Sequence, residues 1–317
     1  MDVRAVFELP VPIWVMCDAL DATYSTGYGN LRFRVVMPQN RPPFGGPPEI
    51  PGIDSPNDEQ IMWTQEYAAT IPACLEPAIA LQRIAVTDVE GPAYEEKPWF
   101  TPDAQLAEFM NRWFDQVRTW VEIFTGQDLD PNHRVYDAEL VGAGLTFIEP
   151  PLSGAVAGMR ITTPHILPLS ANRWEAIMGL VRDGSEAPLE EVLSRDARAA
   201  HRRHSNRRAV IDAATALEIV LGRHVRSVAS QLPVKQRNRI SARSALGDYI
   251  SIAEHSHLQI AVPIAQLSWV NRLRNDAAHR GMSPNDSDTG DAVQIMIEFL
   301  GAHGRIRHYG DGDPADE

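Results

Sequence analysis

The chain has 317 residues, a length that favours two domains over one, and its 44% hydrophobic and 22% charged residues are typical of a globular protein. Its mean hydropathy is −0.24, and no apolar run approaches the roughly 20 residues of a membrane helix, so we predict no membrane span. Two cysteines, Cys17 and Cys74, exclude a disulfide framework and a four-thiol zinc site, and the start of the sequence lacks signal-peptide character, so we expect a cytoplasmic location.

The net charge of −13 is unevenly distributed. Residues 1–184 hold 12 basic and 25 acidic residues, a net charge of −13, whereas residues 185–309 hold 17 and 13, a net charge of +4. The last segment, 310–317, adds four acidic residues and no basic ones. The overall acidity argues against a protein whose surface is covered with basic residues for binding nucleic acid. The basic second part nevertheless raises the question of a polyanionic partner.

The first half alternates short β-like runs with turns rich in Pro and Gly. A helix is predicted from Pro102 to Phe124, capped by Thr101 and ended by Gly126, and its aromatic stripe predicts packing against a sheet. Residues 38–56 are too rich in Pro and Gly for regular structure. We therefore predict an α+β domain of unknown role over residues 1–170. The strand candidates are residues 7–9, 13–16, 31–37, 84–86 and 140–148.

The second half has helical periodicity throughout and contains no internal repeat. We predict an all-α bundle over residues 171–309, followed by an acidic tail at 310–317. The fold class is thus a two-domain protein with an α+β domain before a helical domain. Its predicted helices are Ala171–Val181, one that opens at Pro188, Arg208–Ser230, Ala242–Ala253, Val262–His279 and Thr289–His303.

Arg274 occupies an unexpected place in the helix predicted over residues 262–279. Leu267, Val270 and Ala277 mark the apolar face, and Arg274 follows Val270 by four residues, which puts a guanidinium on or beside the buried stripe. An unpaired charge there is costly. The structural interpretation is a core arginine tied to a carboxylate such as Glu218.

His279 ends the same helix, just before Gly281. The helix dipole at that end favours the imidazolium ion, a useful setting for a group that exchanges protons near neutral pH. Five residues separate Arg274 from His279, a rotation of about 140°. A site that uses both side chains therefore lies at the helix end or draws on two chains. Spacing alone favours a purely structural role for the pair.

The residues around this pair change that balance. The segment Arg274-Asn275-Asp276-Ala277-Ala278-His279 matches the R-x4-H motif of the HEPN superfamily, including the frequent Asn after the Arg. The segment from Arg207 to Glu218, RRAVIDAATALE, resembles the Ala-rich helix of the Apea-like HEPN group. The resemblance covers about residues 185–305 and does not extend to the first half.

The resemblance implies a four- to five-helix bundle that forms a homodimer and brings two R-x4-H motifs together. Many members are metal-independent endoribonucleases in toxin–antitoxin, abortive-infection or phage-defence systems. His279 would then activate the ribose 2′-hydroxyl or protonate the leaving oxygen, Arg274 would stabilise the charge on the phosphorane, and Asn275 would orient the site. The substrate would be RNA, the products would carry 2′,3′-cyclic phosphates, and an antitoxin or regulatory partner would fit such a system. An alternative within the family is a non-catalytic module that dimerises or binds a nucleotide or RNA.

A second basic feature lies between residues 198 and 208, which contain two histidines and no acid. This stretch suits either an RNA backbone or a solvated turn between helices, and it could also pair with the acidic first domain. His201 and His204 lack a third ligand, so we predict no metal site. The sequence has no phosphate-loop, dinucleotide-binding or nucleophile-elbow motif, so we predict no cofactor. A third interpretation is a plain interaction protein. The candidate phosphate-binding residues are Arg198, Arg202, Arg203, Arg207 and Arg208.

Overall fold

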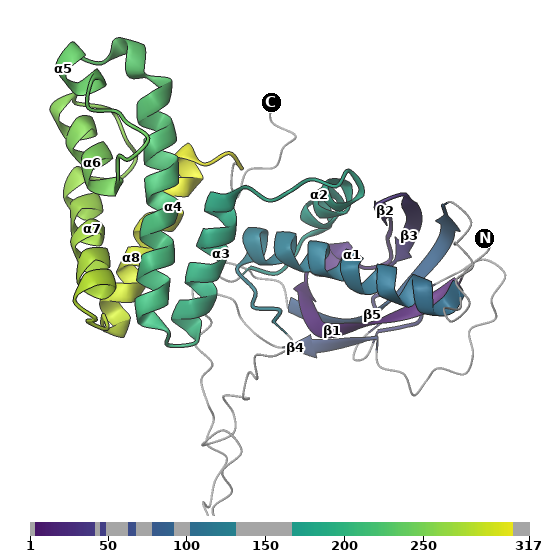
Figure 1. Cartoon of the computed structure of the whole chain (residues 1–317). Coiled ribbons are helices and arrows are strands. Elements are labelled where there is room, and N and C mark those ends of the chain that lie inside the picture. Colours follow the sequence, from purple (N-terminus) through teal and green to yellow (C-terminus); the bar gives the residue numbers. More distant parts are fainter. Residues whose placement is uncertain are drawn as a thin grey trace, which may run out of the picture. The chain divides into compact units, whose positions relative to one another are not determined.

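The computed structural model describes residues 4–41, 45–48, 63–67, 78–91, 102–130 and 167–306. The chain forms two compact units, Met1–Ser185 and Glu186–Glu317 (Figure 1). The strand predicted over residues 140–148, Thr101, Cys74 and the acidic tail lie outside the described residues, as does most of the loop predicted over 38–56. Within the described part, no helix combines the length and apolar character needed to cross a membrane.

An antiparallel sheet forms the first unit. Its order is β1-β5-β3-β2, and β4 also pairs with β5. The 13-residue strand β5 pairs with β1 along one edge, while its other edge pairs first with β4 and then with β3. The predicted strands are confirmed within β1, β3 and β5. The strands are β1 (Arg4–Val15), β2 (Thr23–Tyr28), β3 (Leu31–Val36), β4 (Thr64–Tyr67) and β5 (Ala78–Glu90).

The predicted aromatic helix is confirmed as α1 (Pro102–Thr125), and it ends at Gly126 with a φ of 72°. Trp113 of α1 is fully buried, and its ring lies edge-on to that of Phe33 with a centroid separation of 5.5 Å. Its Nε1 donates to Thr26 Oγ1 at 3.1 Å, and the same hydroxyl donates to the carbonyl of Met178 at 3.2 Å. A single hydroxyl thus joins β2, α1 and the next helix.

That next helix, α2 (Ala171–Arg182), belongs to the first unit. The boundary lies after Ser185 and not after residue 170, where the sequence pattern placed it. Leu169, two residues before α2, forms a parallel bridge with Val15 of β1, so α2 begins next to the sheet. Periodicity shows that a helix has an apolar face but not which neighbour covers it. The buried face of α2 consists of Trp174, Ile177, Met178 and Val181.

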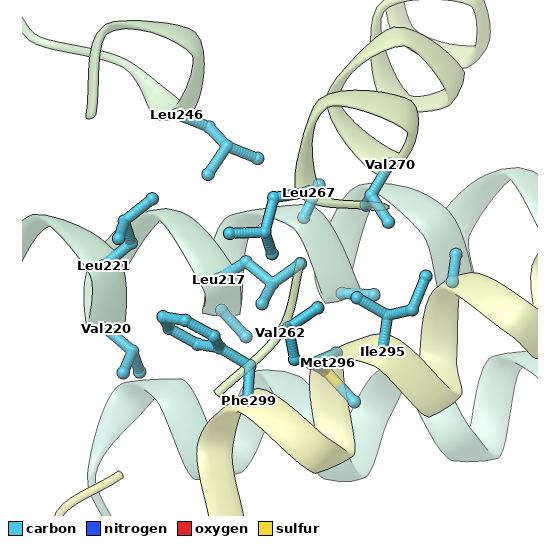
Figure 2. Packing of buried hydrophobic residues seen from close by; sticks show 14 of the residues in the cluster. Leu217, Val220, Leu221, Leu246, Val262, Leu267, Val270, Ile295, Met296 and Phe299 are labelled. Atoms are coloured by element: carbon cyan, nitrogen blue, oxygen red, sulfur yellow. The ribbon is translucent and has the colours of Figure 1, made fainter. Parts of the chain in front are cut away.

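The second unit is helical, as predicted. Its core lies among α4, α6, α7 and α8 (Figure 2), where Leu217, Leu267 and Phe299 are fully buried. The short helix α5 was not predicted. The helices are α3 (Leu189–Arg202), α4 (Asn206–Ser227), α5 (Val234–Arg237), α6 (Leu246–His255), α7 (Ile264–His279) and α8 (Asp286–His303).

Candidate functional site

The helix that carries the candidate pair is α7. It begins after Pro263, whose φ of −56° suits the start of a helix, and it stops before Gly281, which has a left-handed φ of 67°. Leu267, Val270 and Ala277 are buried, so the predicted apolar face is confirmed. The helix is therefore anchored by its apolar face, and its polar side chains take fixed directions from that anchor.

Arg274 is half-buried at the edge of this apolar face. Its Nη1 donates to Oδ1 of the neighbouring Asn275 at 3.2 Å. The alternative partner, Glu218, instead accepts a hydrogen bond from the backbone N–H of Leu246 at 3.0 Å, where it stabilises the start of α6. The guanidinium therefore lies beside a neutral amide, and the structural ion pair with Glu218 is not formed.

His279 is exposed in the last turn of α7. Its imidazole forms no hydrogen bond or ion pair with any residue that the structure describes, whereas the adjacent Arg280 pairs with Asp276 at 2.9 Å. Arg274 and His279 are separated by about 140° around α7 and about 7.5 Å along it. One copy of α7 thus presents the two side chains in different directions, so a centre that uses both lies at the helix end or draws on two copies.

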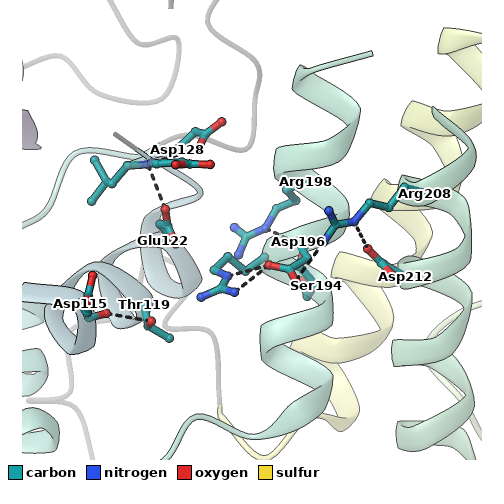
Figure 3. Close-up of polar contacts among 12 residues, drawn as sticks. Asp115, Thr119, Glu122, Asp128, Ser194, Asp196, Arg198, Arg208 and Asp212 are labelled. Carbon is teal, nitrogen blue, oxygen red and sulfur yellow. Dashed lines mark hydrogen bonds and ion pairs between the residues drawn. The ribbon is translucent and has the colours of Figure 1, made fainter. Parts of the chain in front are cut away.

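The predicted phosphate-binding cluster is largely occupied by other contacts. Arg198 is only 7% exposed, and its Nε donates to the carbonyl of Ser194 at 3.4 Å. Arg208 pairs with Asp212 at 3.3 Å and with Asp196 at 3.6 Å (Figure 3). Two carboxylates just outside residues 198–208, those of Asp196 and Asp212, neutralise part of the positive charge of this stretch.

Three further members of the cluster differ in exposure. Arg202 and Arg203 are half-buried, whereas Arg207 is exposed. Exposure rises along the stretch, so only its last two arginines, Arg207 and Arg208, are exposed. This cluster is therefore a weaker candidate for a phosphate surface than its composition indicates.

His201 and His204 do lie together, but on a carboxylate. Nε2 of His201 is 3.5 Å from Oδ1 of Asp286, and Nδ1 of His204 is 3.3 Å from the same atom. His204 adopts a left-handed φ of 55° between α3 and α4. Among the described residues, no group of three or more His, Cys, Asp or Glu side chains is arranged to hold a metal ion. The two histidines instead join the α3–α4 turn to the start of α8.

A second basic region was missed at the sequence level. It follows α4, and its signal is an acid-free stretch of 29 residues between Glu218 and Asp248. Arginines are denser at residues 198–208, but two carboxylates lie near Arg208 there. The more useful measure is the number of cations without a carboxylate nearby, which only the fold reveals. The exposed cations of this region are Arg226, Lys235, Arg237, Arg239 and Arg243.

The comparisons with known proteins do not decide between these interpretations. No family model, curated protein or solved structure matches the chain. The features of the chain that bear on its function are the residues of α7 and the resemblance of their motif.

Proposed function

We propose that the second unit is a metal-independent endoribonuclease domain of HEPN type. The observation that carries the proposal is the placement of Arg274 and His279 on α7. Both side chains reach solvent, and neither pairs with a carboxylate in the described part of the chain. A cation and an imidazole kept free in this way are available to a phosphodiester.

The chemistry follows from the two groups. His279 of one copy takes the proton of the ribose 2′-hydroxyl as its oxygen attacks phosphorus, and the bond from phosphorus to the 5′-oxygen breaks. The second copy's His279 gives a proton to that leaving oxygen. Arg274 stabilises the added negative charge on the phosphorane, and Asn275 holds its guanidinium. The products are a 2′,3′-cyclic phosphate and a 5′-hydroxyl, and the step needs no metal.

The rotation of 140° between the two side chains supports a homodimer as the active form. Two α7 helices that meet near their C-terminal ends bring one chain's Arg274 towards the partner's His279. As a cytoplasmic toxin-like or defence effector, such an enzyme needs restraint. We assign that role to an antitoxin or regulatory partner, for which the acidic first unit is the candidate recruiting surface.

A second candidate function is a non-catalytic HEPN module that dimerises or binds RNA. One observation favours it: His279 lacks an orienting hydrogen-bond partner among the described residues. A general base is ordinarily held in position by a third group. In the nuclease, this group would come from the second copy or from the substrate.

A cleavage assay separates the two functions. Purified protein is incubated with total RNA in EDTA, as wild type, Arg274→Ala, His279→Ala and Arg272→Ala. Arg272 is an exposed arginine on the same helix, so it controls for charge. We expect Arg272→Ala to cleave like wild type, and His279→Ala to lose activity by about 100- to 10,000-fold.

Equal cleavage by wild type, Arg274→Ala and His279→Ala would overturn the nuclease proposal, because the activity would then come from a contaminant. RNA binding without cleavage by any of the four proteins would favour the non-catalytic module. Cleavage by wild-type protein that is monomeric at the assay concentration would contradict the two-copy site.

A further inference from the structure

The acid-free stretch after Glu218 forms a positively charged surface on the second unit. It contains six arginines and lysines and ends at Asp248. Arg223 is neutralised because it forms an ion pair with the buried Glu190. The other five cations are exposed, and no carboxylate in the described residues lies within ion-pair distance of them. We call this set the α5 surface: Arg226, Lys235, Arg237, Arg239 and Arg243.

Neutral side chains hold part of the α5 surface in place. The guanidinium of Arg226 lies 5.1 Å from the ring centroid of Tyr249 and donates to its hydroxyl. Arg239 donates to Oε1 of Gln236 at 3.0 Å and to Oγ of Ser251 at 3.2 Å. Arg226 comes from α4 and Arg239 from the segment after α5, yet both are held by α6. These contacts reduce the motion of the two arginines and leave their charges uncompensated.

Helix α6 links the α5 surface to the helix that carries the proposed catalytic pair. Arg243 is followed within three residues by the start of α6, and Gly247 in its first turn lies against α7: a Cβ placed on Gly247 would be 3.1 Å from Nδ2 of Asn271. Asn271 precedes Arg274 by three residues, about 4.5 Å along the helix. The basic surface is therefore connected through α6 to the middle of α7, and His279 lies eight residues, about 12 Å along the helix, beyond Asn271.

We propose that the α5 surface binds the phosphate backbone of single-stranded RNA and so carries the substrate of this nuclease. The choice of RNA rests on the proposed function. Five uncompensated cations spread over two helices and a connecting segment suit a chain of phosphates better than one small anion. The arginine cluster at residues 198–208 does not fit this role, because Arg208 already has two carboxylates and Arg198 is buried.

The test measures binding without cleavage. The probe is a fluorescent 2′-O-methyl RNA of mixed sequence, which has no free 2′-hydroxyl and is not cleaved. Wild type is compared with Lys235→Gln/Arg237→Gln/Arg243→Gln, which removes three cations of the surface. The control, Arg34→Gln/Arg112→Gln/Arg182→Gln, removes the same charge from exposed arginines that are paired with Asp88, Glu108 and Asp183.

The expected effect follows from counterion release. For single strands, the slope of log K against log salt is about −0.7 per phosphate contact, so loss of three contacts reduces the slope by about 2. If the two lines converge near 1 M salt, the affinity at 0.1 M falls about 100-fold. The control should keep both the slope and the affinity of wild type.

Three results would overturn the proposal. The first is equal binding by wild type and the surface variant, and the second is an equal loss in the control, which would reflect net charge alone. The third is binding of wild type to vesicles of phosphatidylserine and phosphatidylcholine but not to the RNA probe, which would make the surface a membrane contact. If the surface variant binds the probe more weakly than wild type, but wild type does not cleave natural RNA, the α5 surface is upheld as a binding site and only the nuclease proposal is rejected.

Discussion

Arg223 is the main partner of a buried carboxylate, and its replacement should destabilise the second unit. Glu190, in the first turn of α3, is only 2% exposed. Arg223 of α4 pairs with it and also donates to the carbonyl of His303 at 3.2 Å. Arg305 lies 3.7 Å away but is 64% exposed. The pair therefore joins α3, α4 and the end of α8.

The change Arg223→Met keeps the aliphatic bulk and removes the charge. Breaking a fully buried pair from one side costs about 3–5 kcal/mol. Because Arg223 is 29% exposed and Arg305 remains, we expect the free energy of unfolding to fall by about 2–3 kcal/mol. With an m-value of about 2 kcal/mol/M in urea, the midpoint followed by helical circular dichroism would fall by about 1 M.

Two further variants sharpen this test. Arg226→Met lies three residues further along α4, contacts only a phenol and should cost less than about 1 kcal/mol. Glu190→Met combined with Arg223→Met should recover much of the loss, since no charge is then left buried. An Arg223→Met midpoint indistinguishable from wild type would refute the reasoning, because Glu190 would then not depend on its partner.

Two other predictions concern the same unit. Burial, and to a smaller degree the charge of His224, lower the pKa of His303 from 6.5. Below pH 6.5 the unfolded chain therefore binds more protons at this site, so stability falls as the pH decreases. The variant His303→Gln should make the urea midpoint change less between pH 7 and pH 5. Gly222→Ala places a Cβ 2.9 Å from the ring of Tyr249 and should lower the melting temperature. Gly301→Ala meets no atom within 4 Å and should raise it, because Ala favours a helix; the opposite order in thermal unfolding would contradict the packing argument.

Much of the fold was predictable because the helices are amphipathic with regular spacing. The apolar residues of α1, α4, α7 and α8 recur on one face, and each helix forms close to its predicted range. Strand β2 was missed because its sequence, TYSTGY, is mostly polar and includes Gly27. Its burial alternates only in the folded sheet, where Thr26 is satisfied by Trp113 and Met178.

The place of Arg274 on α7 was predictable, but its contacts were not. The spacing of Arg274 from Val270 correctly placed it beside the buried face. Sequence could not show that Glu218 caps α6 instead of pairing with Arg274. The pair of Arg208 with Asp212 follows from the i,i+4 spacing, but its second pair, with Asp196, depends on how α3 packs against α4. Local pattern gives the direction of a side chain, whereas its partner depends on long-range packing.

The hydroxyl of Thr26 also bears on how the chain folds during synthesis. Thr26 and Met178 are 152 residues apart, whereas the contact of His201 with Asp286 in the second unit spans 85. Long sequence separation slows folding, so the second unit should reach its native state faster than the first. The first unit cannot close until α2 has left the ribosome. A nascent chain that stops before residue 171 leaves the α2-facing side of β2 uncovered, and apolar surface exposed in this way is prone to aggregate.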